Sequence, residues 1–113
     1  MGVETVTFDC SDPDRLAQWW AGVLGGTVNA LVPGEFVLVA HDGGPKLGFQ
    51  RVDDPTPGKT RIHLDFSVSD LDTELARLVA LGATESAQHS FGDDFRWVVL
   101  TDPDGNAFCI AAG

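Results

Sequence analysis

The chain of 113 residues has few basic side chains. Seven Lys and Arg stand against 17 Asp and Glu, which gives a formal net charge of −10. A surface of this sign repels phosphate backbones, so the charge balance argues against nucleic-acid binding. The acidic residues are dispersed along the chain, which is typical of a solvated surface. We therefore expect no nucleic-acid partner.

Long apolar runs and cysteines are also scarce. No apolar stretch approaches the ~20 residues that a membrane-spanning helix needs, and the N-terminus has neither the basic nor the apolar region of a signal peptide. The two cysteines, Cys10 and Cys109, have neither C-x-x-C nor zinc-knuckle spacing. We expect a cytoplasmic protein with no membrane partner, whose cysteines are thiols.

The most informative stretch is 60–70, T-R-I-H-L-D-F-S-V-S-D. Here a polar set alternates with an apolar set: Arg61, His63, Asp65 and Ser67 against Ile62, Leu64, Phe66 and Val68. Such alternation puts the two sets on opposite faces of a strand. We expect the apolar face to bury against the helix that follows, and the polar face to carry any chemistry.

The same arrangement occurs near the N-terminus. Thr5, Thr7 and Asp9 alternate with apolar residues and precede a helix start at Asp12-Pro13, where Asp is an N-cap and Pro the first helical residue. Thr5 precedes Asp12 by as many residues as His63 precedes Asp70. This spacing predicts an internal repeat.

Each half of the sequence predicts strand–helix–strand–strand–strand. Strands are expected over 3–10, 27–32, 35–41, 46–52, 60–68, 84–90, 94–101 and 106–111, and helices from Asp12 to Gly25 and from Ser69 or Asp70 to Gly82. A Pro- and Gly-containing linker over 53–60 separates module 1 (about 1–52) from module 2 (about 61–113). We predict one α+β domain over 1–113, in which two βαβββ modules form an eight-stranded curved sheet, a cup lined by its uncovered polar face.

Two phrases resemble a known family. R-I-H-L-D-F-S-V-S-D-L-D and the closing D-P-D-G-N-A-F-C, together with the doubled plan, are similar to the vicinal oxygen chelate superfamily, in particular to its glyoxalase-like domain proteins of the glyoxalase/bleomycin resistance/dioxygenase type. The resemblance covers nearly the whole chain. It implies the fold predicted above, a small-molecule ligand and a homodimer, which would also cover exposed sheet edges.

The resemblance also implies positions for a divalent metal. In metal-dependent members, His, Glu or Gln side chains on the cup strands hold the ion, which stabilises an enediolate or a similar anion. His63 matches one ligand position and Gln50 falls near another. Thr5 and Cys109 occupy the remaining two and depart from the pattern. The expected cofactor is therefore none, or a divalent metal held by His63 and Gln50 with an incomplete ligand set.

The candidate site follows from these positions. His63 and Asp65 are the candidate catalytic pair, because an acidic neighbour on the same face can orient an imidazole that acts as base or metal ligand. The candidate ligand-binding residues are Thr5, Thr7, Gln50, Ser67, Trp97 and Cys109.

Each candidate also has a structural interpretation. The ring of His63 can be held by Asp65 or by a backbone carbonyl, and Asp65 can pair with Arg61 or Arg96. Cys109 can be a small buried hydrophobe. The aromatic residues Trp97, Phe95 and Phe49 can fill the core instead of lining a pocket.

Three functions stay open at this point. The first is a lyase or isomerase acting on a small oxygenated metabolite, with His63 as base or metal ligand. The second is a metal-free protein that sequesters a small hydrophobic or aromatic molecule, as antibiotic-resistance relatives do. The third is a partner subunit whose cup its own side chains fill, against which the polar strip counts, because burying such groups is costly.

Overall fold

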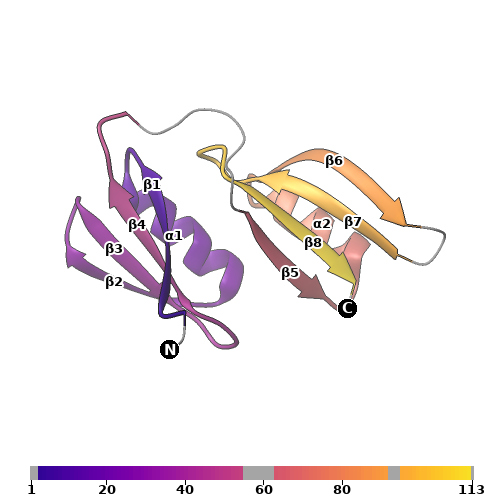
Figure 1. Ribbon diagram of the computed structural model, residues 1–113, viewed down its shortest axis with the longest axis horizontal. Helices are drawn as coiled ribbons and strands as arrows, with labels where there is room; N and C mark the ends of the chain where they lie inside the picture. Colours follow the sequence, from indigo (N-terminus) through magenta and orange to yellow (C-terminus); the bar gives the residue numbers. More distant parts are fainter. Residues whose placement is uncertain (1–2, 55–62, 92–94, 113) are drawn as a thin grey trace. The chain divides into compact units, whose positions relative to one another are not determined.

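The computed structural model describes residues 3–54, 63–91 and 95–112. The chain divides into two compact units, Met1–Thr56 and Pro57–Gly113. Each unit contains one four-stranded sheet and one helix (Figure 1). The boundary between the units falls inside the predicted linker 53–60, of which residues 55–60 lie outside the described part.

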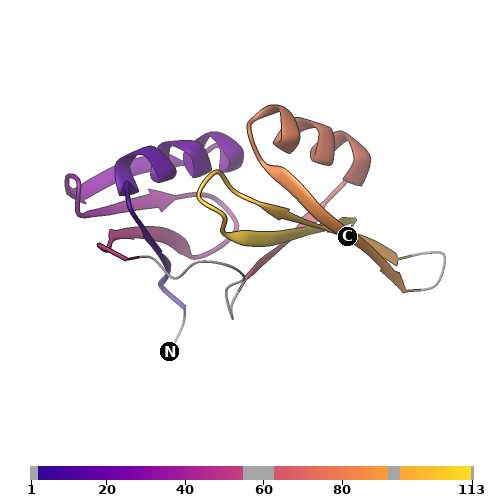
Figure 2. The same ribbon diagram turned by 90° about the horizontal axis from the view of Figure 1, so that it is seen from above.

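The first unit holds five elements in chain order. They are β1 (Thr5–Cys10), α1 (Pro13–Leu24), β2 (Thr27–Val32), β3 (Phe36–Ala40) and β4 (Lys46–Arg51). The strands lie in the order β1-β4-β3-β2, with β1 parallel to β4 and the other neighbours antiparallel. Helix α1 covers one face of this sheet (Figure 2).

Local signals set the ends of α1. The Asp12 side chain accepts a hydrogen bond from the Arg15 backbone N–H, and Pro13 occupies the first turn. Gly25 ends the helix with φ 64°, a left-handed conformation that glycine adopts without strain. The buried stripe of the helix includes Trp20, whose ring centroid lies 5.9 Å from that of Phe8 on β1.

The second unit repeats the plan. Its elements are β5 (Leu64–Val68), α2 (Leu71–Ala80), β6 (Thr84–Phe91), β7 (Phe95–Thr101) and β8 (Ala107–Ala112). The strands lie in the order β5-β8-β7-β6, and β5 is again parallel to β8. Asp70, not Ser69, is the N-cap of α2, since its side chain accepts from the Thr73 backbone N–H at 3.2 Å.

The core of the second unit lies between α2 and one face of the sheet. Its fully buried apolar side chains are Leu78, Val98, Leu100, Phe108 and Ile110. Val79, the next residue of α2 after Leu78, is instead 48% exposed. Successive residues point about 100° apart around a helix, so Leu78 is buried while Val79 is exposed.

The predicted α+β class and the doubled strand–helix–strand–strand–strand order are confirmed. The strand predicted over 60–68 corresponds to β5, which begins at Leu64. Residues 60–62 of the predicted strand lie outside the described residues. Union of the modules into one domain around a common cup stays a prediction. Among the described residues, no helix is long and apolar enough to cross a membrane.

Candidate functional site

The face of the second sheet opposite α2 is defined by strand register. Asp65 on β5 is paired with Cys109 on β8, which is paired with Val99 on β7. One step along, Ser67 is paired with Ala111, and Ala111 with Trp97. Directly paired residues project to the same side of a sheet, and their chain neighbours project to the other. The neighbours Val98 and Ile110 belong to the core under α2, so this second set occupies the opposite face.

That face carries a hollow of about 430 Å³, whose lining comes from β5, β7 and β8. Its lining residues are Asp65, Phe66, Ser67, Phe95, Trp97, Cys109, Ile110, Ala111 and Ala112. We call this hollow the β5–β8–β7 groove. It has an aromatic side on β7 and a polar side on β5, separated by the small side chains of β8.

The aromatic side consists of Phe95 and Trp97, and the ring of His89 on β6 stacks on Trp97 without lining the groove. The Trp97 centroid lies 5.7 Å from that of Phe95 and 5.2 Å from that of His89, with interplanar angles of 43° and 30°. Trp97 is half-buried, and Phe95 and His89 are exposed. Ring spacings of this size are those of stacked or tilted aromatic pairs. Trp97 lines the groove, and its part in ligand binding stays a prediction.

The polar side begins at His63, just before β5. The Nε2 atom of His63 lies 3.5 Å from Oδ1 of Asp65, and the two side chains are 42% and 74% exposed. The ligand atoms of His63, Asp65 and Cys109 all lie within 4.8 Å of one another. We call these three residues the His63–Asp65–Cys109 cluster. The structure therefore brings the two predicted catalytic residues together with one predicted ligand-binding residue.

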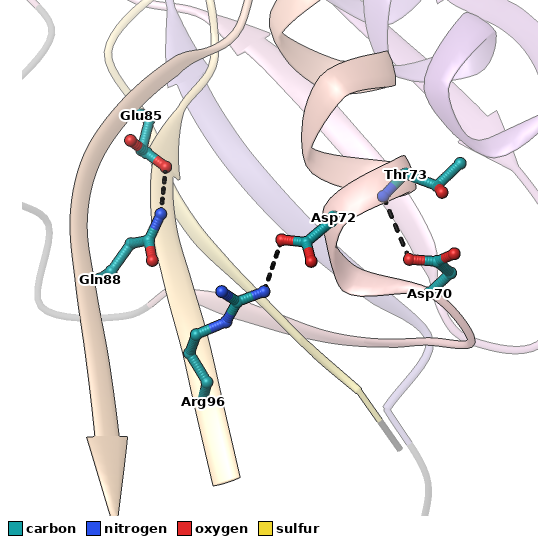
Figure 3. Close-up of polar contacts among 6 residues, drawn as sticks. All are labelled: Asp70, Asp72, Thr73, Glu85, Gln88 and Arg96. Carbon is teal, nitrogen blue, oxygen red and sulfur yellow. Dashed lines mark hydrogen bonds and ion pairs between the residues drawn. The ribbon is translucent and has the colours of Figure 1, made fainter. Parts of the chain in front are cut away.

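The alternative pairing of Asp65 with Arg96 is wrong. The Arg96 guanidinium donates to Asp72 at the start of α2, at 2.6 Å (Figure 3). Arg96 alternates with Trp97 along β7 and so points to the helix side of the sheet. The other alternative partner, Arg61, lies outside the described residues.

Cys109 combines the two interpretations that the sequence left open. Its side chain is buried, like a small hydrophobe, and it also lines the groove. Cys10, by contrast, is buried in the first unit, where its Sγ donates to the Gln50 backbone carbonyl at 3.7 Å.

The other predicted ligand-binding residues, Thr5, Thr7 and Gln50, belong to the first unit. A Cβ on Gly48 would lie 2.9 Å from the Thr7 hydroxyl and 3.1 Å from the Thr5 methyl, so Thr5 and Thr7 lie on the side of the sheet that Gly48 faces. Gln50 lies two residues after Gly48 on β4 and therefore faces the same side. This side is opposite the buried Phe49, which packs on Phe8 at 5.2 Å and is a core residue. Participation of Thr5, Thr7 and Gln50 in a site stays a prediction.

The donors present can be compared with the divalent metal that the resemblance implies. A Thr hydroxyl at position 5 and a neutral Gln at position 50 are weak ligands, and both lie in the first unit. The donors that come together in the second unit are an imidazole, a carboxylate and a thiol. Hard cations such as Mg²⁺ and Ca²⁺ take oxygen ligands, so this donor set does not fit them.

Two features of the groove are not evident from the sequence. In β7, Val98, Val99 and Leu100 are all apolar, so the sequence alone does not show that Phe95 and Trp97 lie on one face of the sheet. The hollow itself lies over small residues at alternate positions of β8, Cys109 and Ala111. That alternation was the available signal, because small side chains on a central strand leave space above the sheet.

Comparison with known proteins agrees with the fold. The glyoxalase-like domain family matches residues 5–111. A glyoxalase/bleomycin resistance protein/dioxygenase family enzyme from Burkholderia phytofirmans PsJN is 20% identical, with a TM-score of 0.82 over 99% of this chain and 98% of that one. No curated protein sequence matches the chain.

Two further structures are similar at low identity. Fosfomycin resistance protein FosX from Listeria monocytogenes is 16% identical, with a TM-score of 0.80 over 100% of this chain and 93% of that one. A lactoylglutathione lyase from Agrobacterium tumefaciens is 20% identical, with a TM-score of 0.73 over 99% and 93%. At such identities the likeness establishes the fold and leaves the activity open. Because the family match spans almost the entire sequence, the chain belongs to the glyoxalase-like domain family of the glyoxalase/bleomycin resistance/dioxygenase (vicinal oxygen chelate) superfamily.

Proposed function

We propose that the protein binds a small aromatic or oxygenated metabolite in the β5–β8–β7 groove. The observation that carries this proposal is the division of the groove into an aromatic wall, Phe95 and Trp97, and a polar wall, Asp65 and Ser67. Ligand sites are typically concave and apolar, with a few polar groups that fix orientation. A volume of about 430 Å³ suits a molecule of one or two rings.

The two walls select different parts of the ligand. The rings of Phe95 and Trp97 would contact a ligand ring through stacking, which is worth ~0.5–1.5 kcal/mol beyond the buried area. On the opposite wall, the Asp65 carboxylate accepts from a ligand hydroxyl, and the Ser67 hydroxyl both donates and accepts. A ring bearing neighbouring oxygens would use both walls at once.

Catechol, phenol and cyclohexane-1,2-diol test this division. Catechol has the ring and two oxygens, phenol lacks one oxygen, and the diol lacks the aromatic ring. We expect catechol to bind more tightly than either analogue and to shift the indole N–H resonance of Trp97 in ¹H–¹⁵N NMR spectra. Titrations are made with a chelator and a reducing agent present, so that neither a metal nor oxidation contributes.

Two variants make the assignment specific. Trp97→Ala should weaken catechol binding about tenfold, the equivalent of ~1.4 kcal/mol, because it removes one of the two rings of the aromatic wall. Val79→Ala changes an exposed residue of α2 that does not line this groove and should leave binding unchanged. Equal affinity of the Trp97→Ala and Val79→Ala variants would place the site elsewhere.

The pair of His63 and Asp65 favours a second candidate, a lyase or isomerase reaction with His63 as base. With Nε2 carrying its proton toward Asp65, 3.5 Å away, the lone pair of Nδ1 is available to remove a proton next to a ligand carbonyl. The product of that step is an enolate and a protonated imidazole. Exchange of the α-protons of hydroxyacetone for deuterium in D₂O, followed by NMR, measures the step directly.

The expected result is exchange faster than in buffer alone, reduced by about 10²-fold or more in His63→Gln, since general base catalysis contributes ~10²–10⁴-fold. If wild-type protein exchanges the α-protons no faster than buffer alone, the lyase or isomerase candidate is excluded and the binding function is left. The catechol titration and the exchange measurement therefore separate the two candidate functions.

The proposal includes a homodimer in the cytoplasm. Each four-stranded sheet has two edge strands, and the edge strand β2 exposes Leu31 and Val32, each by more than half. Exposed apolar edge strands are unfavourable unless they are covered. Light scattering coupled to gel filtration should give about twice the monomer mass, and a monomer mass at micromolar concentration would contradict the dimer.

A further inference from the structure

Cys109 is a thiol on β8, between the polar wall and the aromatic wall of the β5–β8–β7 groove. Asp65 is directly paired with it across β5 and β8. Its Sγ atom, a carboxylate oxygen of Asp65 and a ring nitrogen of His63 all lie within 4.8 Å of one another. All three residues belong to the second unit, so this arrangement does not depend on how the units are placed.

The His63–Asp65–Cys109 cluster contains the three parts that activate a thiol. A nucleophilic cysteine needs a base that accepts its proton and a third group that supports the base. The His63 imidazole is the base, and its partly exposed side chain is able to rotate toward Sγ. Such contacts are commonly long before a ligand binds. Asp65 Oδ1, 3.5 Å from Nε2, is close enough to stabilise the imidazolium that forms.

The groove determines which reagents reach the thiol. Cys109 is only 7% exposed, so a molecule that stays outside the groove meets little of its side chain. A flat ring lying against Phe95 and Trp97 would hold a ring carbon near Sγ, with its oxygens toward Ser67 on the other wall. The arrangement therefore favours an electrophile that is itself a ring bearing oxygen.

We propose that Cys109 adds covalently to quinones and cyclic enones, which are cyclic α,β-unsaturated carbonyl compounds, when they bind in the groove with His63 as the base. This inference rests on the proposed function, because an ortho-quinone is the oxidised form of catechol and keeps its ring and neighbouring oxygens. The consequence is that the protein captures the reactive form of its ligand as a thioether.

The addition balances without any other reactant. The Cys109 S–H bond breaks, the proton passes to His63, and the sulfur electron pair forms a bond to the β-carbon of the electrophile. The electrons of the C=C bond move to the carbonyl oxygen as an enolate, which takes the proton back from His63. An enone becomes a saturated ketone thioether. A quinone adduct tautomerises to the aromatic diol.

2-Cyclohexen-1-one tests this step, because it has the ring and one carbonyl and does not oxidise thiols. Pre-reduced protein, freed of reductant and kept under nitrogen with chelator, is treated with this enone or with acrylamide, an acyclic acceptor. Peptide mass spectrometry measures the rate at each cysteine. The ratio of the enone rate to the acrylamide rate should be at least about tenfold higher for Cys109 than for N-acetylcysteine, because binding of the ring positions it for attack.

Variants separate the base from the aromatic wall. His63→Gln should slow the reaction of Cys109 with both reagents at least about tenfold, since general base catalysis contributes ~10²–10⁴-fold. Trp97→Ala should lower the enone-to-acrylamide ratio about tenfold, the same loss as for catechol binding. Val79→Ala is the matched control and should keep the wild-type rates. If Trp97→Ala fails to fold, His63→Gln, at an exposed position, still tests the base.

The proposal is overturned if Cys109 shows the same rate ratio as N-acetylcysteine, or if His63→Gln reacts as fast as wild type. Cys10, which is 2% exposed in the first unit, is the internal reference and should stay unmodified while the protein is folded. Catechol binding is measured without any electrophile, so the two proposals fail separately. If catechol binds and Cys109 shows no preference for the ring, the covalent step alone is wrong.

Discussion

Among the residues that the structure describes, Asp102 is a charged residue that is buried. Its contacts point to a structural role. Its carboxylate accepts hydrogen bonds from the backbone N–H groups of Asp104 and Asn106 and from the Asn106 side-chain amide. These contacts close the tight turn between β7 and β8. The phrase D-P-D-G-N, which carried part of the family resemblance, is thus a turn that sets the register of β8, and through it the position of Cys109.

We predict that Asp102→Ala lowers the free energy of unfolding by about 3 kcal/mol. Hydrogen bonds to a charged group contribute ~1.5–3 kcal/mol, and the variant leaves their donors without this acceptor. Urea denaturation followed by circular dichroism measures the change. Asp9→Ala, at an exposed position on β1, is the control and should stay within ~0.5 kcal/mol of wild type. Similar values for the two variants would show that the turn does not depend on this carboxylate.

The groove shows what residue-level reading of the sequence could predict and what it could not. The alternation of His63, Asp65 and Ser67 placed them correctly on one face, because a strand has a strict period of two. The partner of Asp65 could not be predicted, because several basic residues were available and the choice depends on which face each occupies. Arg96 forms an ion pair with Asp72 because it lies on the face of β7 that is directed toward α2.

At the level of elements, helix ends were the best predicted features. Asp12-Pro13 and Asp70 start the two helices as the sequence indicated, because capping acts within four residues. The face that a helix buries is harder to predict from the sequence than its ends. Val79 shows that a hydrophobic stripe does not reveal how far a helix turns over its sheet, since that depends on packing against strands distant in the sequence.

The cap of α2 makes stability depend on pH. The Thr73 backbone N–H, with its side-chain hydroxyl and the Asp72 backbone N–H adding to it, lowers the pKa of Asp70 below its ordinary value of 3.8 (Figure 3). A carboxyl whose pKa is lower in the folded state stabilises the fold above its unfolded pKa. That contribution is lost as pH falls through the folded pKa.

We therefore predict that wild type is more stable than Asp70→Ala at neutral pH and that the difference shrinks below about pH 3.8, the unfolded value. Urea denaturation at several pH values measures the difference, and a ¹³C NMR titration of the Asp70 carboxyl gives its pKa directly. A pKa at or above 3.8 in the folded protein would contradict the capping interaction.

Gly25 and Gly26, at and just after the end of α1, are each required for a different structural reason. Gly25 is needed for its positive φ, whereas Gly26 is needed for space, because a Cβ there would lie 2.6 Å from the backbone carbonyl oxygen of Ala40 on β3. The sequence predicts a helix end at Gly25 but does not show the close approach at Gly26. Only the packing of the α1–β2 connection on β3 reveals it.

We predict that two Gly→Ala substitutions, one inside α1 and one just after it, change the free energy of unfolding in opposite directions. Gly26→Ala should lower the free energy of unfolding by about 1–3 kcal/mol, because backbone cannot yield as a side chain does. Gly22→Ala, inside α1 with nothing within 4 Å of the added Cβ, should raise it by ~0.5–1 kcal/mol through helix propensity. Thermal and urea denaturation compare the two directly, and equal signs would contradict the close approach at Gly26.

At the level of the whole molecule, charge bears on the proposed ligand. The excess of acidic over basic residues, ten in net charge, gives the surface a negative potential that acts over a Debye length, ~30 Å at 0.01 M salt and ~8 Å at 0.15 M. Asp65 adds a negative charge at the groove itself. A neutral or cationic ligand is favoured over an anionic one of the same shape.

We predict that 3,4-dihydroxybenzoate, which is catechol with one added carboxylate, binds several-fold more weakly than catechol at low salt. The difference should narrow as salt screens the repulsion, while catechol affinity stays nearly constant, because a neutral ligand does not respond to the potential. Isothermal titration at about 0.01 M and 0.3 M salt measures both ligands, with chelator present so that no bound cation attracts the carboxylate. A difference that persists unchanged at high salt would mean that the groove rejects the extra group by shape and not by charge.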